Sequence, residues 1–347
     1  MEIRPIKKSE WELLLRFNGE EYSPRHILTN KIYYDWQFDN FANPDHDFYS
    51  TLGLFGKNGE IMGTFGRFPA PYSAYGKTVM GNCLANLIVK KNLRALGYGY
   101  LLLERAGAEG DIAIDHTVNE TAWPMFMKAG WEGENLKRYL YIINSKNDLY
   151  DVPAAGLATI SAGDFGFERI QKFDDTIDAF WERMCGRYPI TIARTAQYLN
   201  WRYAENPLAN YDQFVVKKGL EIKALVVMRV EDVKKDTGPT GIRVGRIVDF
   251  VSDDESQTFA LFRAVEFCRK EQIDFLDYFE SGNFHRKALL ETGFVDGDDT
   301  PYDLIPLLFN PISIKRTHLN FVVKKKSHFP LKDWYTTKGG GDMDRPY

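Results

Sequence analysis

The sequence predicts an α/β protein made of two domains in tandem. The chain has 347 residues, which is long for one domain and comfortable for two. Short apolar runs typical of strands alternate with stretches of helical spacing, and the pattern that begins at residue 1 starts again near residue 167. The same spacing separates Arg4 from Trp36 and Arg169 from Trp201, and an Asn-Pro pair follows each tryptophan. Such an internal repeat indicates two copies of one architecture.

The elements of the first half follow from local patterns. In chain order, the expected elements are strand 1–6, helices 9–17 and 26–41, strands 48–55, 61–68 and 79–89, helix 98–108, strand 112–114, helix 119–128 and strand 138–143. Ser9 is an N-cap residue for the first helix, and Lys57-Asn58-Gly59 is a hairpin turn signal between two strands. Gly130 suits the C-terminal end of the last helix.

The second half is expected after a linker that is rich in small residues. We divide the chain into a first domain over residues 1–145, a linker over 146–164 and a second domain over 165–347. Strands are expected at 167–170, 242–251 and 275–276, and a helix at 284–291. The glycine-rich C-terminal segment is expected to form a loop or an arm.

Composition excludes several classes of protein. The net charge of −4 argues against nucleic acid as a partner. Cys83, Cys185 and Cys268 are widely spaced and form no CxxC pair, which fits a reducing compartment and argues against a disulfide framework or a metal site. We expect a cytoplasmic protein without a membrane span, because the sequence shows neither a signal segment nor a long apolar stretch.

A strand, a loop and a helix stand together in the middle of the first half. Leu87 and Val89 belong to an apolar strand, and a leucine-rich helix follows the loop. The loop residues are Arg94, Ala95, Leu96, Gly97, Tyr98, Gly99 and Tyr100. A helix start with glycine offers backbone N–H groups to an anion such as phosphate. An ordinary strand-to-helix turn is the alternative, and a Rossmann site is disfavoured because G-x-G-x-x-G is absent.

The R-x-x-G-x-G spacing after this strand resembles the pyrophosphate loop of the GNAT superfamily of acyl-CoA-dependent N-acyltransferases. The resemblance implies two GNAT-like domains in tandem, each a twisted mixed β-sheet flanked by helices. It implies acyl-CoA as co-substrate, with the pyrophosphate on Arg94 to Tyr100 and the pantetheine against the backbone of Leu87 and Val89. Asn119 and Phe126 stand where family members contact the cofactor. Asn119 has an alternative role as a helix cap, and Phe126 replaces a tyrosine that often serves as general acid.

The second half lacks the loop. Its long strand leads into Ser252-Asp253-Asp254-Glu255-Ser256, whose carboxylates favour a helix start but repel a pyrophosphate. We therefore predict one CoA site per chain. The second half is left with two roles, as a scaffold or as a binding surface for the acyl acceptor.

Several residues are candidates for the acceptor site. They are Asn82 and Asn86 on the strand before the loop, Trp201, Arg202 and Tyr203 around the repeated tryptophan, and Glu280 and His285 near a strand end. Aromatic rings beside a cation suit a sugar face or a phosphate. The alternative is that the rings belong to the core, that Arg202 forms an internal ion pair, and that Glu280 and His285 are a surface acid and a helix-capping residue.

The catalytic candidates lie at the end of the neighbouring strand. An amine that attacks a thioester must lose protons, and His116 or Asp115 is the predicted base. The Val89 N–H is the predicted donor to the carbonyl oxygen. Nucleophilic catalysis by Cys83 is a minor alternative, because a buried strand cysteine is usually inert.

The sequence as a whole predicts an acyl-CoA-dependent N-acyltransferase. By resemblance to GNAT proteins of bacterial polysaccharide biosynthesis, the expected acceptor is the amine of an amino sugar, in particular a nucleotide-linked one. The alternatives are transfer to another amine, such as an amino acid, a peptide or an antibiotic, and a non-catalytic module that binds CoA. The acyl chain (acetyl, longer or hydroxylated) and the oligomeric state, a homodimer included, stay open.

Overall fold

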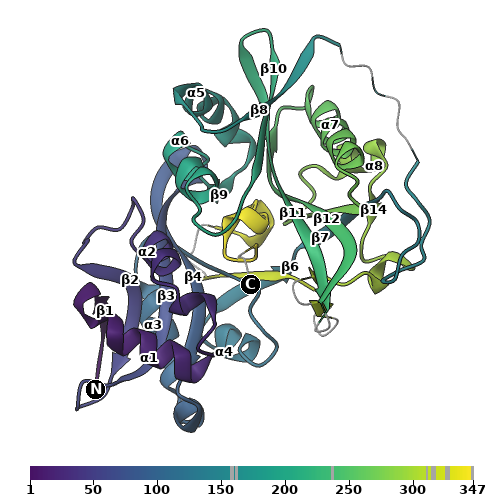
Figure 1. Ribbon diagram of the computed structural model, residues 1–347. Coiled ribbons are helices and arrows are strands. Elements are labelled where there is room, and N and C mark those ends of the chain that lie inside the picture. The colour runs from purple at the N-terminus through teal and green to yellow at the C-terminus, as the bar shows by residue number, and fades with distance from the viewer. Residues whose placement is uncertain are drawn as a thin grey trace.

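The computed structural model describes residues 1–156, 160, 163–235, 238–309, 312–313, 318–324 and 329–344. Its two halves lie side by side, and each is built on a mixed sheet with helices on both faces (Figure 1). The C-terminal segment, yellow in Figure 1, lies between the two halves.

The first half contains most strands of one sheet and the helices that cover it. In chain order its elements are β1 (Glu2–Lys7), α1 (Trp11–Glu21), α2 (Lys31–Phe38), β2 (Phe48–Phe55), β3 (Ile61–Ala74), β4 (Lys77–Val89), α3 (Tyr98–Ala108), β5 (Ile112–His116), α4 (Trp123–Lys128), β6 (Trp131–Asn135) and β7 (Lys137–Ile142). The strand order is β1-β2-β3-β4-β5-β17-β6, where β17 (Asn320–Lys324) comes from the other end of the chain. The pair β4–β5 is parallel.

The side chains of this sheet alternate between two apolar layers. Leu52 and Leu54 of β2 pack with α3 and α4 on one face, whereas Tyr49 and Phe55 pack with α1 and α2 on the other. This alternation is the period-2 pattern of a strand that is covered on both sides.

The second half repeats the arrangement. Its elements are β8 (Phe165–Ile170), α5 (Asp175–Met184), β9 (Ile190–Ile192), α6 (Ala196–Leu199), β10 (Asp212–Lys218), β11 (Glu221–Lys235), β12 (Gly238–Ser252), α7 (Gln257–Lys270), β13 (Phe275–Glu280), α8 (Arg286–Thr292), β14 (Val295–Asp296), β15 (Leu308–Phe309) and β16 (Ile312–Ser313). The sheet order is β14-β7-β13-β12-β11-β10-β8, and β12–β13 is its parallel pair. Helices α5 and α6 cover one face, and α7 and α8 the other.

The two sheets exchange strands. We expected residues 138–143 to end the first sheet, but β7 pairs with β13 and β14 in the second. Strand β17 returns to the first sheet and pairs with β5 and β6. The apolar pattern of a strand identifies it as a strand but does not specify its neighbour, so this pairing could not be predicted. The division at residues 146–164 stays a prediction about folding units.

The repeated tryptophans pack against each other at the junction of the halves. The rings of Trp36 and Trp201 are stacked with centroids 5.3 Å apart. The Trp36 indole N–H donates to the Trp201 carbonyl oxygen and the Trp201 indole N–H to that of Trp36, both at 2.8 Å. This reciprocal contact is what a two-fold relation between two copies of one domain produces.

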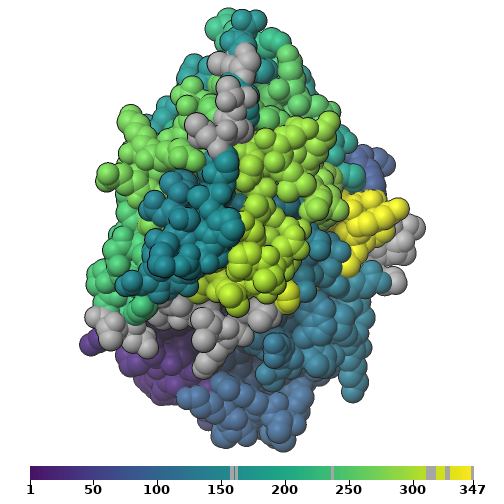
Figure 2. Space-filling view, turned by 90° about the vertical axis from the view of Figure 1, so that its right-hand side faces the viewer, coloured from purple at the N-terminus to yellow at the C-terminus, as the bar shows by residue number. Residues whose placement is uncertain are grey.

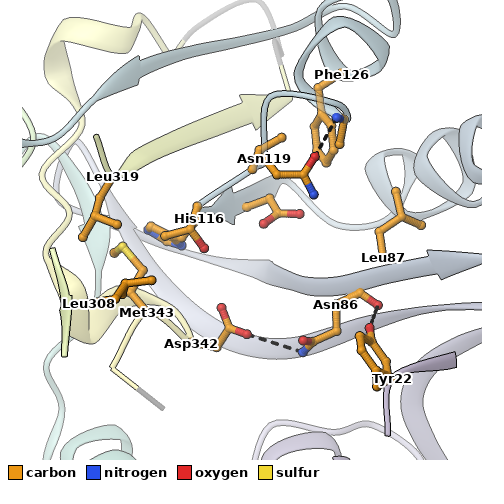
Figure 3. Close-up of a pocket in the computed structure, with 14 residues that line it drawn as sticks. Tyr22, Asn86, Leu87, His116, Asn119, Phe126, Leu308, Leu319, Asp342 and Met343 are labelled. Atoms are coloured by element: carbon orange, nitrogen blue, oxygen red, sulfur yellow. Dashed lines mark hydrogen bonds between the residues drawn. The ribbon is translucent and has the colours of Figure 1, made fainter. Parts of the chain in front are cut away.

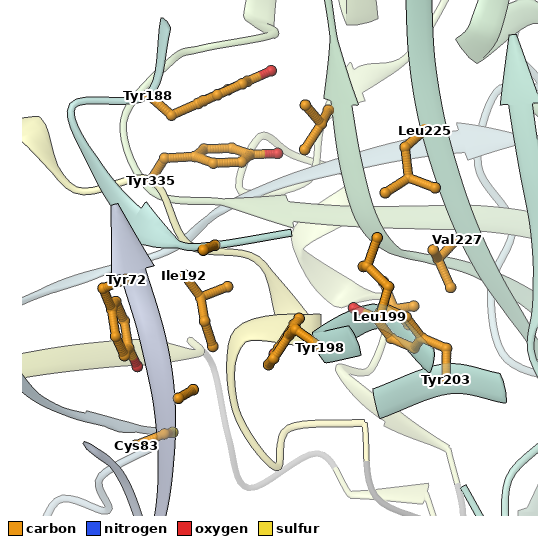
Figure 4. Close-up of a cluster of buried hydrophobic side chains, with 14 of the residues drawn as sticks. Tyr72, Cys83, Tyr188, Ile192, Tyr198, Leu199, Tyr203, Leu225, Val227 and Tyr335 are labelled. Carbon is orange, nitrogen blue, oxygen red and sulfur yellow. The ribbon is translucent and has the colours of Figure 1, made fainter. Parts of the chain in front are cut away.

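A large apolar core joins the halves. Tyr72 and Cys83 of the first half lie beside Ile192 and Tyr198 of the second (Figure 4). On the face shown in Figure 2, the teal segment after β7 lies against the yellow-green segment after α8. Because Tyr72 and Cys83 pack with Ile192 and Tyr198, the two halves share one interior, and β9 pairs with β3 across the junction.

The C-terminal arm, which we define as residues 331–344, is part of this interior. We expected a loop or an arm here, and the structure places this segment in the interior: Thr337 and Lys338 are fully buried, and Tyr335 stacks on Tyr188 at 4.4 Å (Figure 4). Arg345 and Pro346, which belong to the predicted arm, lie outside the described residues. Among the described helices, none is long and apolar enough to span a bilayer.

Candidate active site

Strands β4 and β5 separate where the predicted site begins. Their parallel pairing runs from Gly81 and Ile112 to Leu84 and Asp115 and then stops. Just beyond this point β4 contains a bulge, because its register against β3 shifts between Ala85 and Ile88. Asn86 adopts φ 63° in this bulge. A bulge bends its strand and ends regular pairing, so it turns the rest of β4 away from β5.

A pocket of about 280 Å³ lies at this separation (Figure 3). It is lined by Tyr22, Asn86, Leu87, Asp115, His116, Thr117, Val118, Asn119, Ala122, Phe126, Leu308, Leu319, Asp342 and Met343. Five of the predicted site residues besides Leu87 therefore meet here: Asn86, Asp115, His116, Asn119 and Phe126. The pocket also takes Tyr22 from the end of α1, Leu308 from β15, Leu319 from the residue before β17, and Asp342 and Met343 from the C-terminal arm. Sequence patterns did not connect these residues with the site.

The polar side of the pocket joins the bulge to the arm. The Asn86 side-chain amide donates to a carboxylate oxygen of Asp342 at 3.4 Å, and the Tyr22 hydroxyl donates to the Asn86 carbonyl oxygen at 3.3 Å (Figure 3). Asp115 contributes a second carboxylate and is 7% exposed. Asp342 was missed because nothing in the local sequence of a glycine-rich tail indicates that it enters another domain.

His116 is buried, with 3% of its surface exposed. Its Nε2 lies 2.9 Å from the Thr336 hydroxyl, and its Nδ1 lies 3.6 Å from the Cys83 sulfur. Burial, with a smaller contribution from Arg202, lowers the pKa of His116 to about 3. The imidazole is therefore neutral at physiological pH and a weak proton acceptor, which disfavours the base role that we predicted for it.

The predicted phosphate loop forms a short 3-10 helix, Lys91–Leu96, followed by α3. Gly97 joins them with φ 79°, a left-handed conformation that glycine adopts without strain. A Cβ built on Gly97 meets no atom within 4 Å, so the loop faces open space at this point. The Tyr100 N–H donates to the Gly97 carbonyl oxygen at 3.0 Å, so Tyr98 and Gly99 are the residues of the first turn whose N–H groups are candidates for binding an anion.

The strand before the loop presents its backbone to the gap. The Lys90 N–H donates to the Met62 carbonyl oxygen at 2.9 Å, on the β3 side of the strand. Because backbone N–H groups alternate in direction along a strand, the Val89 N–H points to the other side, toward β5. The Val89 carbonyl oxygen already accepts the Arg94 Nε–H at 3.0 Å. Arg94 also lies 3.6 Å from Glu21, which fixes the loop against α1.

Two predicted cofactor residues have structural partners. The Asn119 side-chain oxygen accepts the Ala122 N–H at 2.9 Å, which closes the turn before α4, whose N-cap residue is Ala122. Phe126 is 1% exposed and packs edge-on against Trp131 at 5.1 Å. Both still line the pocket.

Asn82 lies apart from this site. Its side chain points to a second pocket, of about 680 Å³, on the α3 side of the sheet. It donates to the Glu109 carbonyl oxygen at 3.5 Å. Asn82 and Asn86 are on one strand, but the pairing of β4 with β5 separates them, so the prediction that they serve one acceptor site needs correction.

Trp201, Arg202 and Tyr203 are interior residues. Each is less than 7% exposed, and Arg202 donates to the Gly339 and Gly341 carbonyl oxygens and pairs with Asp344. Their predicted contact with an acceptor is therefore corrected to the alternative, a core position with an internal ion pair. Arg202 contacts the C-terminal arm, whereas Trp201 packs against Trp36.

Glu280 and His285 form a buried network with Tyr188 and Tyr278 in the second half. The His285 Nδ1 lies 2.9 Å from a Glu280 oxygen, and its Nε2 lies 3.0 Å from the Tyr188 hydroxyl. Both side chains are at most 1% exposed, and neither lines the pocket between β4 and β5. Their prediction as acceptor residues is corrected for this reason.

The second half has a strand gap that matches the first. Pairing of β12 with β13 ends at Ile247 and Tyr278, and the β12 register against β11 shifts near Val248. The arm fills this gap: the Ser281 N–H donates to the Thr336 carbonyl oxygen at 3.0 Å, and a Cβ on Gly339 would collide with the Val248 carbonyl oxygen. The gap in the first sheet contains a pocket, whereas the gap in the second sheet is filled by the C-terminal arm.

No protein-family model matches the sequence, and no curated protein sequence matches it. Solved structures do resemble it. A GCN5-related N-acetyltransferase from Anabaena variabilis gives a TM-score of 0.59 over 93% of this chain and 72% of that chain, at 12% identity. Saccharomyces cerevisiae N-myristoyltransferase with bound myristoyl-CoA gives a TM-score of 0.55 over 93% of this chain and 82% of that chain, at 15% identity. A probable N-acyltransferase from Enterococcus faecalis gives a TM-score of 0.55 over 92% of this chain and 72% of that chain, at 11% identity. The chain therefore has the predicted fold, two GNAT-like domains in tandem.

Proposed function

We propose that the protein transfers an acyl group from acyl-CoA to an amine. One observation carries this proposal: a single strand, β4, runs past a pocket at its bulge and leads directly into a glycine loop at the start of a helix. Pantetheine would lie along Leu87 and Val89, and the pyrophosphate would bind the N–H groups from Arg94 to Tyr100. The fold similarity to N-acyltransferases that include a myristoyl-CoA complex supports the same proposal.

The chain's own residues can serve each step of the transfer. The Val89 N–H would donate to the thioester oxygen as it gains charge. The bound ammonium must first lose a proton, and Asp342 and Asp115 are the carboxylates in the pocket that can pass it to solvent. The neutral nitrogen then attacks the carbonyl carbon, the C–S bond breaks, and the second proton of the nitrogen leaves with the thiolate as CoA thiol. Phe126 cannot supply that proton.

We retain an amino sugar, in particular a nucleotide-linked one, as a proposed acceptor. Its support is the sequence resemblance, because the aromatic residues assigned to it are interior. Transfer to another amine is the second candidate, and a non-catalytic CoA-binding module is the third. Phe126 stands where a general acid would be expected. If CoA binds and no amine is acylated, the third candidate is favoured over the first two.

The test is calorimetric titration of the full chain with CoA. We expect one site per chain, because the arm fills the second gap. Gly97→Glu places a carboxylate and a strained left-handed residue in the loop, and we expect at least a tenfold weaker CoA affinity. Gly59→Glu is the matched control, because Gly59 lies in the turn between β2 and β3 and, like Gly97, has a positive φ (78°) and no atom within 4 Å of an added Cβ. Unchanged affinity in Gly97→Glu would contradict the proposed site, and two sites per chain would contradict the role of the arm.

A further inference from the structure

Three apolar side chains close one end of the pocket. They are Leu308 from β15, Leu319 from the residue before β17 and Met343 from the C-terminal arm, and we call them the apolar wall. Leu319 is 1% exposed and Met343 is 6% exposed, and all three pack in the core that joins the two halves. Figure 3 shows the apolar wall on the side of the pocket opposite Leu87. A group that enters the pocket along Leu87 therefore faces this wall.

The pairing of the strands directs an acyl chain toward the apolar wall. In the proposed site the pantetheine follows β4, so the thioester comes to the bulge at Asn86. The chain cannot continue straight between β4 and β5, because the two strands are already paired at Leu84 and Asp115. On the α4 side the pocket is bounded by Phe126, which is 1% exposed and held in the core of the first half. The remaining apolar direction leads to the wall.

The size of the pocket limits the length of this chain. A cavity of about 150 Å³ takes one benzene ring, so a pocket of about 280 Å³ has room for roughly eleven carbon-sized groups. The reacting end of the acceptor must share this room with the acyl group, which leaves space for an acyl chain of only a few carbons. A myristoyl chain exceeds the whole pocket.

The arm holds its part of the wall in place. Asp344, the residue after Met343, pairs with the buried Arg202 and accepts the Tyr211 hydroxyl at 2.6 Å. A longer acyl chain would have to move Met343 against these contacts, because well-packed interiors do not accept extra methylenes without strain.

We propose that the apolar wall limits the acyl donor to short acyl-CoA, from acetyl to butyryl, and that Met343 is the residue that sets this limit. This inference rests on the proposed N-acyl transfer. Up to the limit, each methylene leaves water for the apolar wall and strengthens binding about fourfold. Beyond it, a further methylene stays in water or displaces the wall, and adds nothing to the affinity.

Calorimetric titration of the full chain with a series of donors tests this inference without a known acceptor. The series is CoA, acetyl-CoA, butyryl-CoA, hexanoyl-CoA and myristoyl-CoA. We expect the affinity to rise at least tenfold from CoA to butyryl-CoA and to rise no further in hexanoyl-CoA and myristoyl-CoA. A rise that continues to myristoyl-CoA would overturn the inference, and so would equal affinities for CoA and butyryl-CoA. Failure to bind CoA itself would instead overturn the proposed function.

Met343→Ala tests which residue sets the limit. It removes the side chain beyond Cβ, so we expect the affinity for hexanoyl-CoA, relative to that for CoA, to be at least tenfold higher than in the parent chain. Leu308→Ala should extend the limit in the same direction from a half-buried residue of another segment, and it serves the test if Met343→Ala does not fold. Met184→Ala is the matched control, because it shortens the same type of side chain in the same core but away from the pocket. Parent-like affinities in the folded wall variants, or the same change in Met184→Ala, would refute the role of the wall.

Discussion

Replacement of Arg202 tests how the second half supports the site. Arg202 is 4% exposed, donates to Gly341 at 2.7 Å and to Gly339 at 3.2 Å, and pairs with Asp344. Arg202→Met would leave Asp344, 2% exposed, as a buried charge without this partner. Breaking a buried ion pair from one side costs about 3–5 kcal/mol. Since whole domains are stable by roughly 5–15 kcal/mol, the expected loss is a large share of the total.

The assay is urea unfolding of the full chain, with CoA affinity measured in parallel. We expect Arg202→Met to lose about 4 kcal/mol of unfolding free energy and to retain CoA affinity, because the proposed phosphate loop lies in the other half. The control is Lys146→Met, which breaks an ion pair with Asp151 whose side chains are 75% and 69% exposed. Solvent screens such an exposed pair, so we expect a much smaller loss from Lys146→Met than from Arg202→Met.

A double variant separates the ion pair from the loss of side-chain packing. Arg202→Met with Asp344→Asn removes both charges of the pair, and the asparagine side-chain oxygen can still accept the hydrogen bond that the Tyr211 hydroxyl donates to Asp344 at 2.6 Å. We expect it to be more stable than Arg202→Met alone, with a coupling of at least about 1 kcal/mol. Two results would refute the view that this pair holds the arm. One is a smaller loss of unfolding free energy in Arg202→Met than in Lys146→Met, and the other is strict additivity of the Arg202 and Asp344 substitutions.

Three further outcomes are expected. The pKa of His116 lies at about 3 in the folded protein and near 6.5 when unfolded, so its neutral form stabilises the fold above pH 6.5, and that stability is lost as the pH falls toward 3. When the pH falls from 7 to 4.5, the unfolding free energy of the parent chain should therefore decrease by about 2–3 kcal/mol more than that of His116→Gln, measured by urea unfolding at both pH values. Trp36→Phe removes one of the reciprocal indole bonds and should cost about 1–2 kcal/mol by the same assay, and a neutral effect would count against the pair as a junction contact. Cys83 and Cys268 are buried and Cys185 is not, so a thiol reagent should modify one cysteine in the native chain and three in denaturant, and Cys83→Ser should keep acyl transfer.

Local patterns predicted those elements whose cause is local. Strand β2 and helix α3 begin and end where their apolar periodicity and the flanking glycines place them. The glycine loop and the pair Asp115–His116 were predicted for the same reason, because each follows directly from a strand end. The tandem arrangement followed from the repeated tryptophans, which the structure brings into contact.

What could not be predicted depends on partners far away in sequence. Asp342 contacts Asn86 from 256 residues away, and β17 enters the first sheet from the end of the chain. Polar side chains near a strand end are equally consistent with a site and with a satisfied interior network. Glu280 and His285 belong to the second kind because Tyr188 and Tyr278 supply their partners, and sequence spacing does not reveal such partners.

The two halves differ mainly in what fills the gap of each sheet. Both sheets separate after a short parallel pair beside a bulge, so the backbone of each offers a strand-like groove. In the second sheet residues 336–341 occupy the groove, and three carboxylates follow at the helix start in place of a glycine loop. The occupied groove orients the arm so that its next residues, Asp342 and Met343, reach the pocket of the first sheet. The second half therefore contributes to the site by fixing one segment of chain, and a substitution in its interior should change the proton-accepting side of the pocket before it changes the binding of CoA.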